Sequence, residues 1–304
     1  MRRATDGVKS FDTFAASSPS VLLSNHWWLS KMRLTKFTIK SAQDLIPRRK
    51  KSDNKSTGGK SLIIAGSEGM FGAAVLTSTA ASRVGSGYVI LFTSRSAFLT
   101  VEHPSFMVVD SAKKQIPLAR ATAIAIGPGL GNSAKACKWV RQIITAAPRN
   151  VVIDADALTI CSKKNLWPLP KTWLATPHEG ELARILSVSA NEIRKDRRKA
   201  IVAARKKMGC IVVLKGSSTL VLGDRLSVIE AGNSALAKAG TGDVLTGVIV
   251  GLLAQGLAPE EAACLGVFIH GSTADDWVAK GNDHLSLMPE DLLECLPKTL
   301  KRLR

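Results

Sequence analysis

The chain has few aromatic residues and no cysteine pattern of the kind that builds disulfide-rich domains or zinc sites. Phe, Trp and Tyr make up 5% of its 304 residues, and Tyr88 is the sole tyrosine, so the body lacks stacking platforms for RNA or DNA bases. The five cysteines are widely spaced without a C-x-x-C pair, which indicates reduced thiols. We therefore expect a cytoplasmic protein that does not use nucleic acid as its partner.

Long hydrophobic runs are also missing. The longest apolar run, residues 244–258, is about one turn short of a membrane span and contains Thr246 and Gln255. Its Gly247-x-x-x-Gly251 spacing is expected to serve close packing of a buried helix rather than a membrane dimer. The apolar core at residues 21–23 is too short for a secretory signal. We expect no association with a membrane.

Positive charge is concentrated at the start of the chain. The net charge is +18, and residues 1–60 carry 13 Lys/Arg against 4 Asp/Glu, which is half of the excess. Residues 1–37 show no hydrophobic period, and we expect a basic, disordered extension there, followed by one folded domain over residues 38–304. A start at Met32 and a transit peptide are both compatible with this composition.

From residue 61 onward, apolar strands alternate with helices. Two long apolar helices are expected at the end of the chain, from Asp243 and from Pro259. Continuous apolar strands between helices are typical of a mainly parallel sheet covered on both faces, so we predict an α/β fold. The predicted strands cover residues 62–65, 88–92, 121–126, 151–153, 172–175 and 211–214, with 219–222 as a hairpin partner.

The most informative segment is Gly240-Thr241-Gly242-Asp243, which directly precedes a long apolar helix. Free N–H groups and the helix dipole make such a turn suitable for an anion, and glycine lets a phosphate approach the backbone. Asp243 would then be placed to take a proton from an attacking hydroxyl. The alternative is that Asp243 caps a buried helix and the glycines form a tight turn. This segment alone leaves both interpretations open.

Other polar clusters follow the predicted strands, and ligands of open α/β sheets bind at the carboxyl ends of strands. Asp154 and Asp156 would point to opposite faces if their strand continued, so at most one faces the cleft. Either could hold Mg²⁺ through water or belong to an ordinary turn. Lys215, beside Gly216, is either a phosphate contact or a surface lysine.

Two further clusters also have structural alternatives. His178 and Glu181 are three residues apart, so both reach one ligand if a helix begins there. The alternative is that Thr176-Pro-His-Glu179 forms a helix cap followed by a first-turn acid. Gly127-x-Gly129-x-Gly131 lacks the G-x-G-x-x-G spacing of a dinucleotide fingerprint. Two interpretations of this segment stay open: a loop that a substrate approaches closely, or a plain turn.

In combination, these motifs resemble the ADP/ATP-dependent NAD(P)H-hydrate dehydratases of the ribokinase-like superfamily, from about residue 38 to the C-terminus. The resemblance implies a ribokinase-like three-layer α/β/α fold with a mainly parallel sheet. Six motifs carry it, in the order found in the family: Ile63–Ser67 with Gly72–Ala74, Gly127–Gly131, Val152–Ala157, Thr176–Glu181, Val213–Gly216 and Gly240–Gly247.

The resemblance implies the repair of hydrated NADH or NADPH: the ring hydroxyl is phosphorylated by ADP or ATP, and phosphate is then eliminated. Asp243 would be the catalytic base, and Glu181 sits where the superfamily keeps an acid associated with Mg²⁺. The implied binding residues are Ala73, Gly129, His178 and Asp243 for the hydrated dinucleotide, Lys215, Gly216, Ser217, Ser218, Thr219 and Gly242 for the nucleotide, and Gly240, Thr241 and Gly242 as the anion hole.

The chain departs from the family pattern at Ser234, Lys238 and Ala239, and Asn54-Lys55 stands where a His-Lys pair is common. The family also implies a homo-oligomer, and an epimerase carried by a separate chain. Two alternatives stay open: a kinase of the same fold for a vitamin precursor of hydroxymethylpyrimidine or hydroxyethylthiazole type, and a non-catalytic nucleotide-binding protein. The choice between ADP and ATP stays open as well, because both would use the same glycine-lysine loop.

Overall fold

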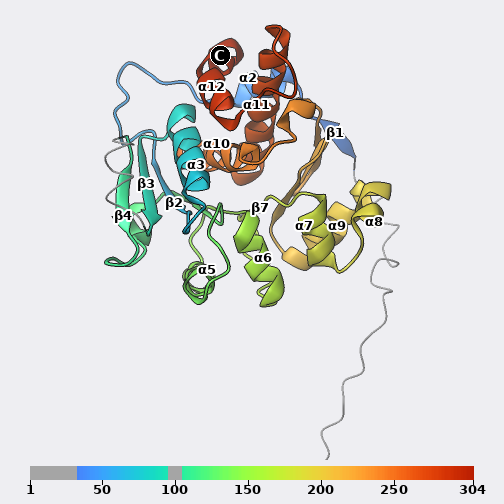
Figure 1. The fold of residues 1–304 in the computed structure, drawn as a ribbon. Helices are drawn as coiled ribbons and strands as arrows, with labels where there is room; N and C mark the ends of the chain where they lie inside the picture. The colour runs from blue at the N-terminus through green and yellow to red at the C-terminus, as the bar shows by residue number, and fades with distance from the viewer. Residues whose placement is uncertain (1–32, 95–104) are drawn as a thin grey trace, which may run out of the picture.

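The computed structural model describes residues 33–94 and 105–304 (Figure 1). Within them, ten strands form one sheet in which β9 alone runs antiparallel to its neighbours. The sheet order is β1 (Leu34–Lys36), β10 (Leu226–Ile229), β9 (Thr219–Leu222), β8 (Ile211–Leu214), β7 (Leu174–Ala175), β6 (Val151–Ile153), β5 (Ala123–Ile126), β2 (Lys60–Ile64), β3 (Tyr88–Thr93) and β4 (Met107–Asp110).

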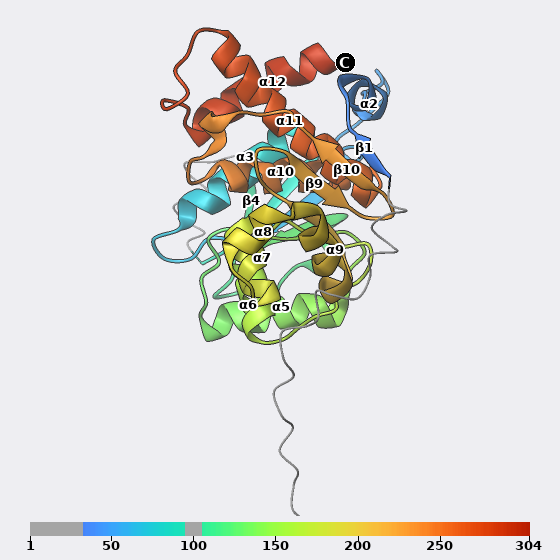
Figure 2. The same ribbon diagram turned by 90° about the vertical axis from the view of Figure 1, so that its right-hand side faces the viewer.

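Helices cover both faces of this sheet (Figures 1 and 2). On one side lie α2 (Ile39–Leu45), α3 (Phe71–Val84), α10 (Thr241–Ala254), α11 (Pro259–Ala279) and α12 (Pro289–Leu303). On the other lie α5 (Ala134–Ala146), α6 (Ala155–Lys163), α7 (Glu179–Leu186), α8 (Ala190–Lys195) and α9 (Arg197–Met208). The predicted three-layer α/β/α class, with a mainly parallel sheet, is confirmed.

The strands are apolar throughout because successive side chains enter two different cores. Ile63 belongs to the core under α10, whereas Leu62 and Ile64 belong to the core on the opposite face. Helix α10 is apolar all round because it lies between the sheet and other helices. Gly247 and Gly251 bring it against α3, as the sequence predicts: a Cβ at 247 would lie 2.6 Å from the Ala80 Cβ.

The chain reverses its direction of travel across the sheet at β2. Strands β3 and β4 follow on one side of β2, whereas β5 and β6 follow on the other, which makes the β2–β5 boundary a topological switch point. The loops after these two strands contact each other there, with the Gly66 N–H donating to the Pro128 carbonyl at 3.0 Å. Ligand sites of open α/β sheets lie at this edge.

The structure adds one element at each end of the predicted arrangement. Leu34–Lys36 pair in parallel with Leu226–Val228, so the folded part includes residues placed in the predicted extension of residues 1–37. The rest of that prediction, including Met32, lies outside the described residues. A third helix, α12, follows the two apolar helices expected at the end; its polar face interrupts the apolar run that the prediction relied on.

No helix in the described part of the chain is both long and apolar enough to cross a membrane.

Candidate active site

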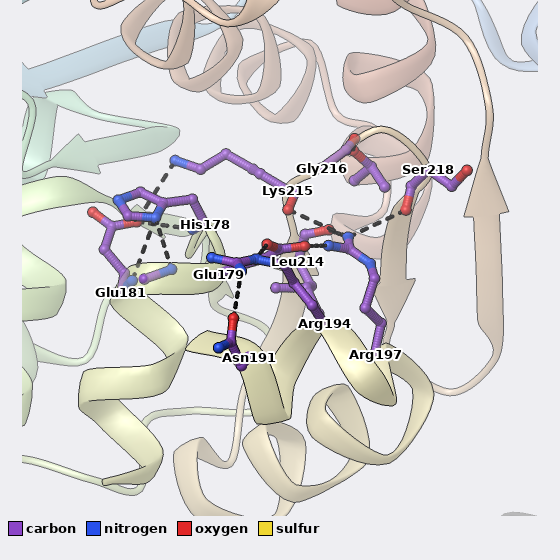
Figure 3. A network of polar contacts seen from close by, with 12 residues as sticks. His178, Glu179, Glu181, Asn191, Arg194, Arg197, Leu214, Lys215, Gly216 and Ser218 are labelled. Carbon is purple, nitrogen blue, oxygen red and sulfur yellow. Dashed lines mark hydrogen bonds and ion pairs between the residues drawn. The ribbon is translucent and has the colours of Figure 1, made fainter. Parts of the chain in front are cut away.

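The loops after three neighbouring strands carry the predicted polar clusters to one place. Asp154 follows β6, His178 and Glu181 follow β7, and Lys215 follows β8. The Lys215 Nζ lies 3.0 Å from Asp154 Oδ1 and 3.9 Å from Glu181 Oε2. Figure 3 shows the Lys215 side chain extended toward Glu181 and His178. The tertiary structure thus joins three motifs that are far apart in sequence.

Asp154 and Lys215 form a buried ion pair at the back of the site. Asp154 is 2% exposed, and the Thr246 hydroxyl of α10 donates to its Oδ2 at 2.7 Å. Burial raises the pKa of Asp154, but the Lys215 charge and the Thr246 hydrogen bond outweigh burial, and the pKa lies below its usual value. For Lys215, burial lowers the pKa and the Asp154 and Glu181 charges raise it, with a net rise. Both groups are therefore charged at neutral pH.

Asp243 is the third residue of α10 and is partly buried. Its pKa is raised to about 7, first by burial and then by the negative charge of Asp154, while the Lys215 charge opposes both. A carboxylate with a pKa near 7 accepts a proton far better than an ordinary aspartate, and about half of it is ionised at neutral pH. The geometry therefore fits the base predicted at this position.

The turn before α10 requires glycine at position 240. Gly240 has a φ of +91°, and a Cβ there would lie 2.7 Å from Pro289 Cγ. Gly242 has open space except for the Lys215 Nζ, which would lie 3.7 Å from an added Cβ. The N–H groups of Gly242 and Asp243 begin the helix, where backbone donors have no partner within the helix. They and the Lys215 ammonium face one region suited to an anion.

Thr241, predicted as part of the anion hole, makes contacts within the turn. Its N–H donates to the Lys238 carbonyl at 3.4 Å, and its hydroxyl lies 2.8 Å from the Leu236 carbonyl oxygen. These donors are used inside the turn. Thr241 therefore holds the turn in shape, and the donors at this helix end come from the following residues.

His270, in α11, was not predicted as a site residue. It is 8% exposed, and its Nε2 lies 2.9 Å from the Thr241 carbonyl oxygen; because a carbonyl only accepts, the ring nitrogen donates. Burial lowers its pKa to about 4, so the ring is neutral and adds no charge beside the anion turn. The sequence gives one signal, a histidine inside the apolar helix from Pro259, but it does not reveal the partner.

A cavity of about 400 Å³ opens beside Lys215. Of the six residues predicted to bind the nucleotide, only Ser218 is absent from its lining. Across the cavity, Asn233, Ser234 and His270 supply polar groups, while Leu245 and Val267 supply an apolar wall. A mostly apolar hollow with a few polar groups and a cation at one end suits a base joined to phosphates.

The residues predicted for the dinucleotide side come from separate elements: Ala73 is in the first turn of α3, Gly129 follows β5, His178 caps α7 and Asp243 is in α10. Ala73 and Gly129 adjoin at the switch point: a Cβ at 129 would lie 3.0 Å from the Ala73 Cβ. His178 is the N-cap of α7, and its Nδ1 accepts from the Gly180 N–H at 3.0 Å. A helix cap does lie within the predicted segment Thr176–Glu179, and the capping residue is His178. The same imidazole is 55% exposed, which leaves its outer edge open to a ligand.

The expectation that Asp154 and Asp156 point to opposite faces rested on a strand that continues. The strand ends at Ile153 and α6 begins at Ala155, so that premise was wrong. Asp154 turns to Lys215, whereas the Asp156 Oδ2 accepts from the Gly131 N–H at 2.8 Å. Asp156 and Glu181 also line a second hollow of about 250 Å³.

The carboxylates around Lys215 bear on where Mg²⁺ would bind. Among the described residues, no group of three or more His, Cys, Asp or Glu side chains is arranged to hold a metal ion. Mg²⁺ usually keeps several waters and binds one or two carboxylates together with substrate phosphates. Glu181 offers one such carboxylate: its side chain is 10% exposed, and one of its oxygens accepts from the His178 N–H at 2.9 Å, which fixes its position.

Two departures from the family pattern leave the anion turn intact. The Lys238 ammonium donates to the Leu285 carbonyl at 2.7 Å, which holds it on the neighbouring loop. The Ser234 hydroxyl lies 3.2 Å from His284 Nδ1 and lines the nucleotide-sized cavity. Nothing in the structure explains the alanine at position 239.

Comparisons with known proteins agree with this arrangement. The model of a family described as NAD(P)H-hydrate dehydratase matches residues 61–298. An ADP-dependent (S)-NAD(P)H-hydrate dehydratase of Bacillus subtilis is 33% identical over 282 residues, covering 89% of this chain and 99% of the relative. A bifunctional NAD(P)H-hydrate repair enzyme of Coxiella burnetii is 37% identical over 256 residues, covering 82% of this chain and 51% of the relative. The chain thus spans about half the length of such bifunctional relatives.

Among solved structures, the ADP/ATP-dependent NAD(P)H-hydrate dehydratase of Bacillus subtilis, co-crystallised with ATP and Mg²⁺, superposes with a TM-score of 0.81. The two sequences are 31% identical, and the match covers 90% of this chain and all of the other.

Proposed function

The chain belongs to the NAD(P)H-hydrate dehydratase family, and we propose that it catalyses the nucleotide-dependent dehydration of hydrated NADH and NADPH. One observation carries the proposal: Asp243 stands at the start of α10 beside Lys215, and Lys215 also lines the nucleotide-sized cavity. A base, a cation and helix N–H groups are thus placed around one point. Phosphoryl transfer depends on this kind of positioning and charge neutralisation.

We propose that ADP or ATP occupies the cavity with its phosphates toward Lys215 and Gly242. The loop from Lys215 to Thr219 would contact the phosphates, and Leu245 would pack against the base. Mg²⁺ would arrive with the phosphates, with Glu181 as its protein carboxylate through water, and would neutralise phosphate charge. The relative co-crystallised with ATP and Mg²⁺ supports this assignment.

In the first step, Asp243 accepts the proton of the ring hydroxyl. The hydroxyl oxygen forms a bond to the terminal phosphorus, and the bond from that phosphorus to the bridging oxygen of the nucleotide breaks. Lys215 and the N–H groups of Gly242 and Asp243 are placed to stabilise the charge on the transferred group. The negative charge of Asp154 holds Lys215 at this point.

In the second step, phosphate departs from the ring carbon, and a proton is lost from the neighbouring carbon as the double bond forms. Phosphate is a much better leaving group than hydroxide, which is why phosphorylation makes dehydration feasible. Ala73, Gly129 and the exposed edge of His178 are proposed to hold the hydrated dinucleotide during both steps.

The test mixes the purified protein with NADH hydrate, Mg²⁺ and either ADP or ATP, and follows absorbance at 340 nm together with free phosphate. A rise in absorbance with stoichiometric phosphate, dependent on one nucleotide, is the expected result and names the donor. A phosphorylated product without a rise in absorbance, or nucleotide binding without turnover, would contradict the proposal in favour of a kinase or of a non-catalytic protein.

The homo-oligomer, the separate epimerase and the cytoplasmic location stay predictions.

A further inference from the structure

The first residue of α9, Arg197, reaches the loop that lines the nucleotide cavity. Its Nη2 lies 3.1 Å from the Leu214 carbonyl oxygen, 3.3 Å from that of Lys215 and 3.2 Å from that of Ser218. Figure 3 shows the guanidinium under this loop. One planar cation thus contacts carbonyls at both ends of the segment Lys215–Ser218.

The other side of the guanidinium is paired with a carboxylate. Arg197 Nη1 donates to Glu179 Oε1, in the first turn of α7, and its side chain is 20% exposed. Glu179 directly follows His178, which is the cap of the same helix. Arg197 therefore connects the loop on the nucleotide side with the helix end that carries His178 and Glu181.

Gly216 is explained by the same contact. A Cβ at this position would lie 2.5 Å from Arg197 Nη1 and 2.6 Å from Nη2. Gly216 is not among the residues with positive φ, so backbone conformation does not require glycine there. A methyl group at this position would instead displace the guanidinium packed against the Gly216 Cα.

The contacts also orient the backbone donors of the loop. In a trans peptide the C=O and the following N–H point in opposite directions. Because the Lys215 carbonyl points to Arg197, the Gly216 N–H is directed away from the guanidinium. Gly216, Ser217 and Thr219 line the cavity, so a donor turned away from Arg197 is available to an anion bound there.

We propose that Arg197 is a positioning residue that holds the Lys215–Thr219 loop in the conformation that binds the nucleotide phosphates. The inference rests on the proposed function in one respect, the assignment of this loop to ADP or ATP. Lysine cannot replace arginine here, since an ammonium lacks the planar fork that reaches Glu179 and the loop carbonyls together. Arg197 does not line the cavity and acts through the loop.

Arg194 provides a matched control on the same carboxylate. Its Nε donates to Glu179 Oε2 at 3.0 Å and its Nη1 to Asn191 Oδ1 at 2.6 Å. Its side chain is 58% exposed, and it bonds to Glu179 and Asn191 rather than to the loop. Replacing Arg194 therefore removes an ion pair to Glu179 without removing a support of the loop.

The experiment measures binding of ADP and of ATP, each with Mg²⁺, by calorimetry without any dinucleotide. Arg197→Lys should weaken the Kd at least tenfold and raise the KM for the nucleotide equally, with kcat at saturating nucleotide within threefold of the wild type. Arg194→Lys should change the Kd less than twofold. Thermal unfolding verifies that each variant is folded. Wild-type affinity in Arg197→Lys, or an equal loss in Arg194→Lys, would overturn the proposal.

A second variant tests the packing directly. Gly216→Ala should weaken nucleotide binding about as much as Arg197→Lys does, because the new methyl group displaces the guanidinium. In an Arg197→Ala background, where no guanidinium is present, the same methyl should change the Kd less than twofold. An equal loss in both backgrounds would show that the methyl acts on the nucleotide itself and would contradict the proposed packing.

These readouts separate this proposal from the proposed function. If the wild type binds ADP or ATP but does not restore NADH, the dehydratase assignment fails and the role of Arg197 stands. If NADH is restored by wild type and by Arg197→Lys with the same KM for the nucleotide, the role of Arg197 fails and the dehydratase assignment stands.

Discussion

Lys215 Nζ and Asp154 Oδ1 are 3.0 Å apart, and this pair connects the ends of two strands, β8 and β6, that are not neighbours in the sheet. The same carboxylate accepts from Thr246, one turn after Asp243 in α10. Asp154 therefore holds both Lys215, whose charge would meet the phosphates, and α10, which carries the base Asp243. Changes at Asp154 should thus affect both.

Asp243→Asn should reduce turnover about 10²- to 10⁴-fold, the range expected when a general base is removed. Measured kcat with NADH hydrate and saturating nucleotide checks this. Unchanged turnover in a folded variant would refute the assigned base.

The same substitution should stabilise the protein at alkaline pH. The folded state raises the pKa of Asp243 from 3.8 to about 7, so ionising this group destabilises the folded protein. This destabilisation is absent below pH 4, increases between pH 4 and pH 7, and reaches its full value above pH 7. Asp243→Asn removes a cost of at most about 4 kcal/mol, less where water screens the group. The Tm of the variant relative to the wild type should therefore be higher at pH 8 than at pH 4. A gain that is equal at both pH values would contradict the raised pKa.

Asp154→Asn should move the pH dependence of kcat/KM. In the wild type, kcat/KM should rise with pH through about 7 as Asp243 ionises. Removing the neighbouring negative charge, one of the causes of the raised pKa, should shift this rise to lower pH. Thr246→Val serves as the control, since it removes the hydrogen bond to Asp154 and keeps its charge. A midpoint that stays near 7 in Asp154→Asn would argue against coupling between the two carboxylates.

Glu181→Gln should increase the Mg²⁺ concentration needed for half-maximal activity about tenfold or more, as replacement of a group around a metal typically does. Glutamine keeps an oxygen that can accept from the His178 N–H, so α7 should stay capped. Glu192→Gln is the matched control, because Glu192 occupies the same capping-box position in α8 but is exposed, and its carboxylate accepts from the Ser189 N–H. Equal Mg²⁺ dependence of the two variants would exclude Glu181 from the metal site.

Deleting residues 1–37 should lower the Tm relative to deleting residues 1–32. The longer deletion removes the pairing of Leu34–Lys36 with β10 and the contact of the Phe37 ring with Phe268, whose centroids are 5.7 Å apart. Loss of one packed aromatic side chain alone is worth about 2 kcal/mol. Equal melting temperatures would place the start of the stable domain at residue 38, as predicted from the sequence.

Much of the fold was predictable because it depends on patterns within short stretches of sequence. The apolar strands and the helices between them follow from periodicity over short windows, and the α/β class follows from their alternation. Strand β1 and helix α12 were missed because neither has the continuous apolar pattern on which the prediction relied. The strand is three exposed residues long, and the helix buries only one face.

The site was only partly predictable. The glycine turn before Asp243 and the loop at Lys215 could be located because their residue types have few other uses at strand ends and helix starts. His270 and Arg197 could not be found in this way. Each contacts a backbone carbonyl of a distant segment. Every residue has such a carbonyl, so the residue types do not reveal which one is contacted.

The sequence by itself determined the fold class, the family and which strand ends carry polar groups, because each depends on residue types at short spacing. Only the tertiary structure decided which of these groups meet. The order of strands in the sheet brings Asp154 to Lys215 across β7 and raises the pKa of Asp243 by burial beside them. Those effects depend on distances of a few ångströms between segments up to 92 residues apart, such as Asp154 and Thr246.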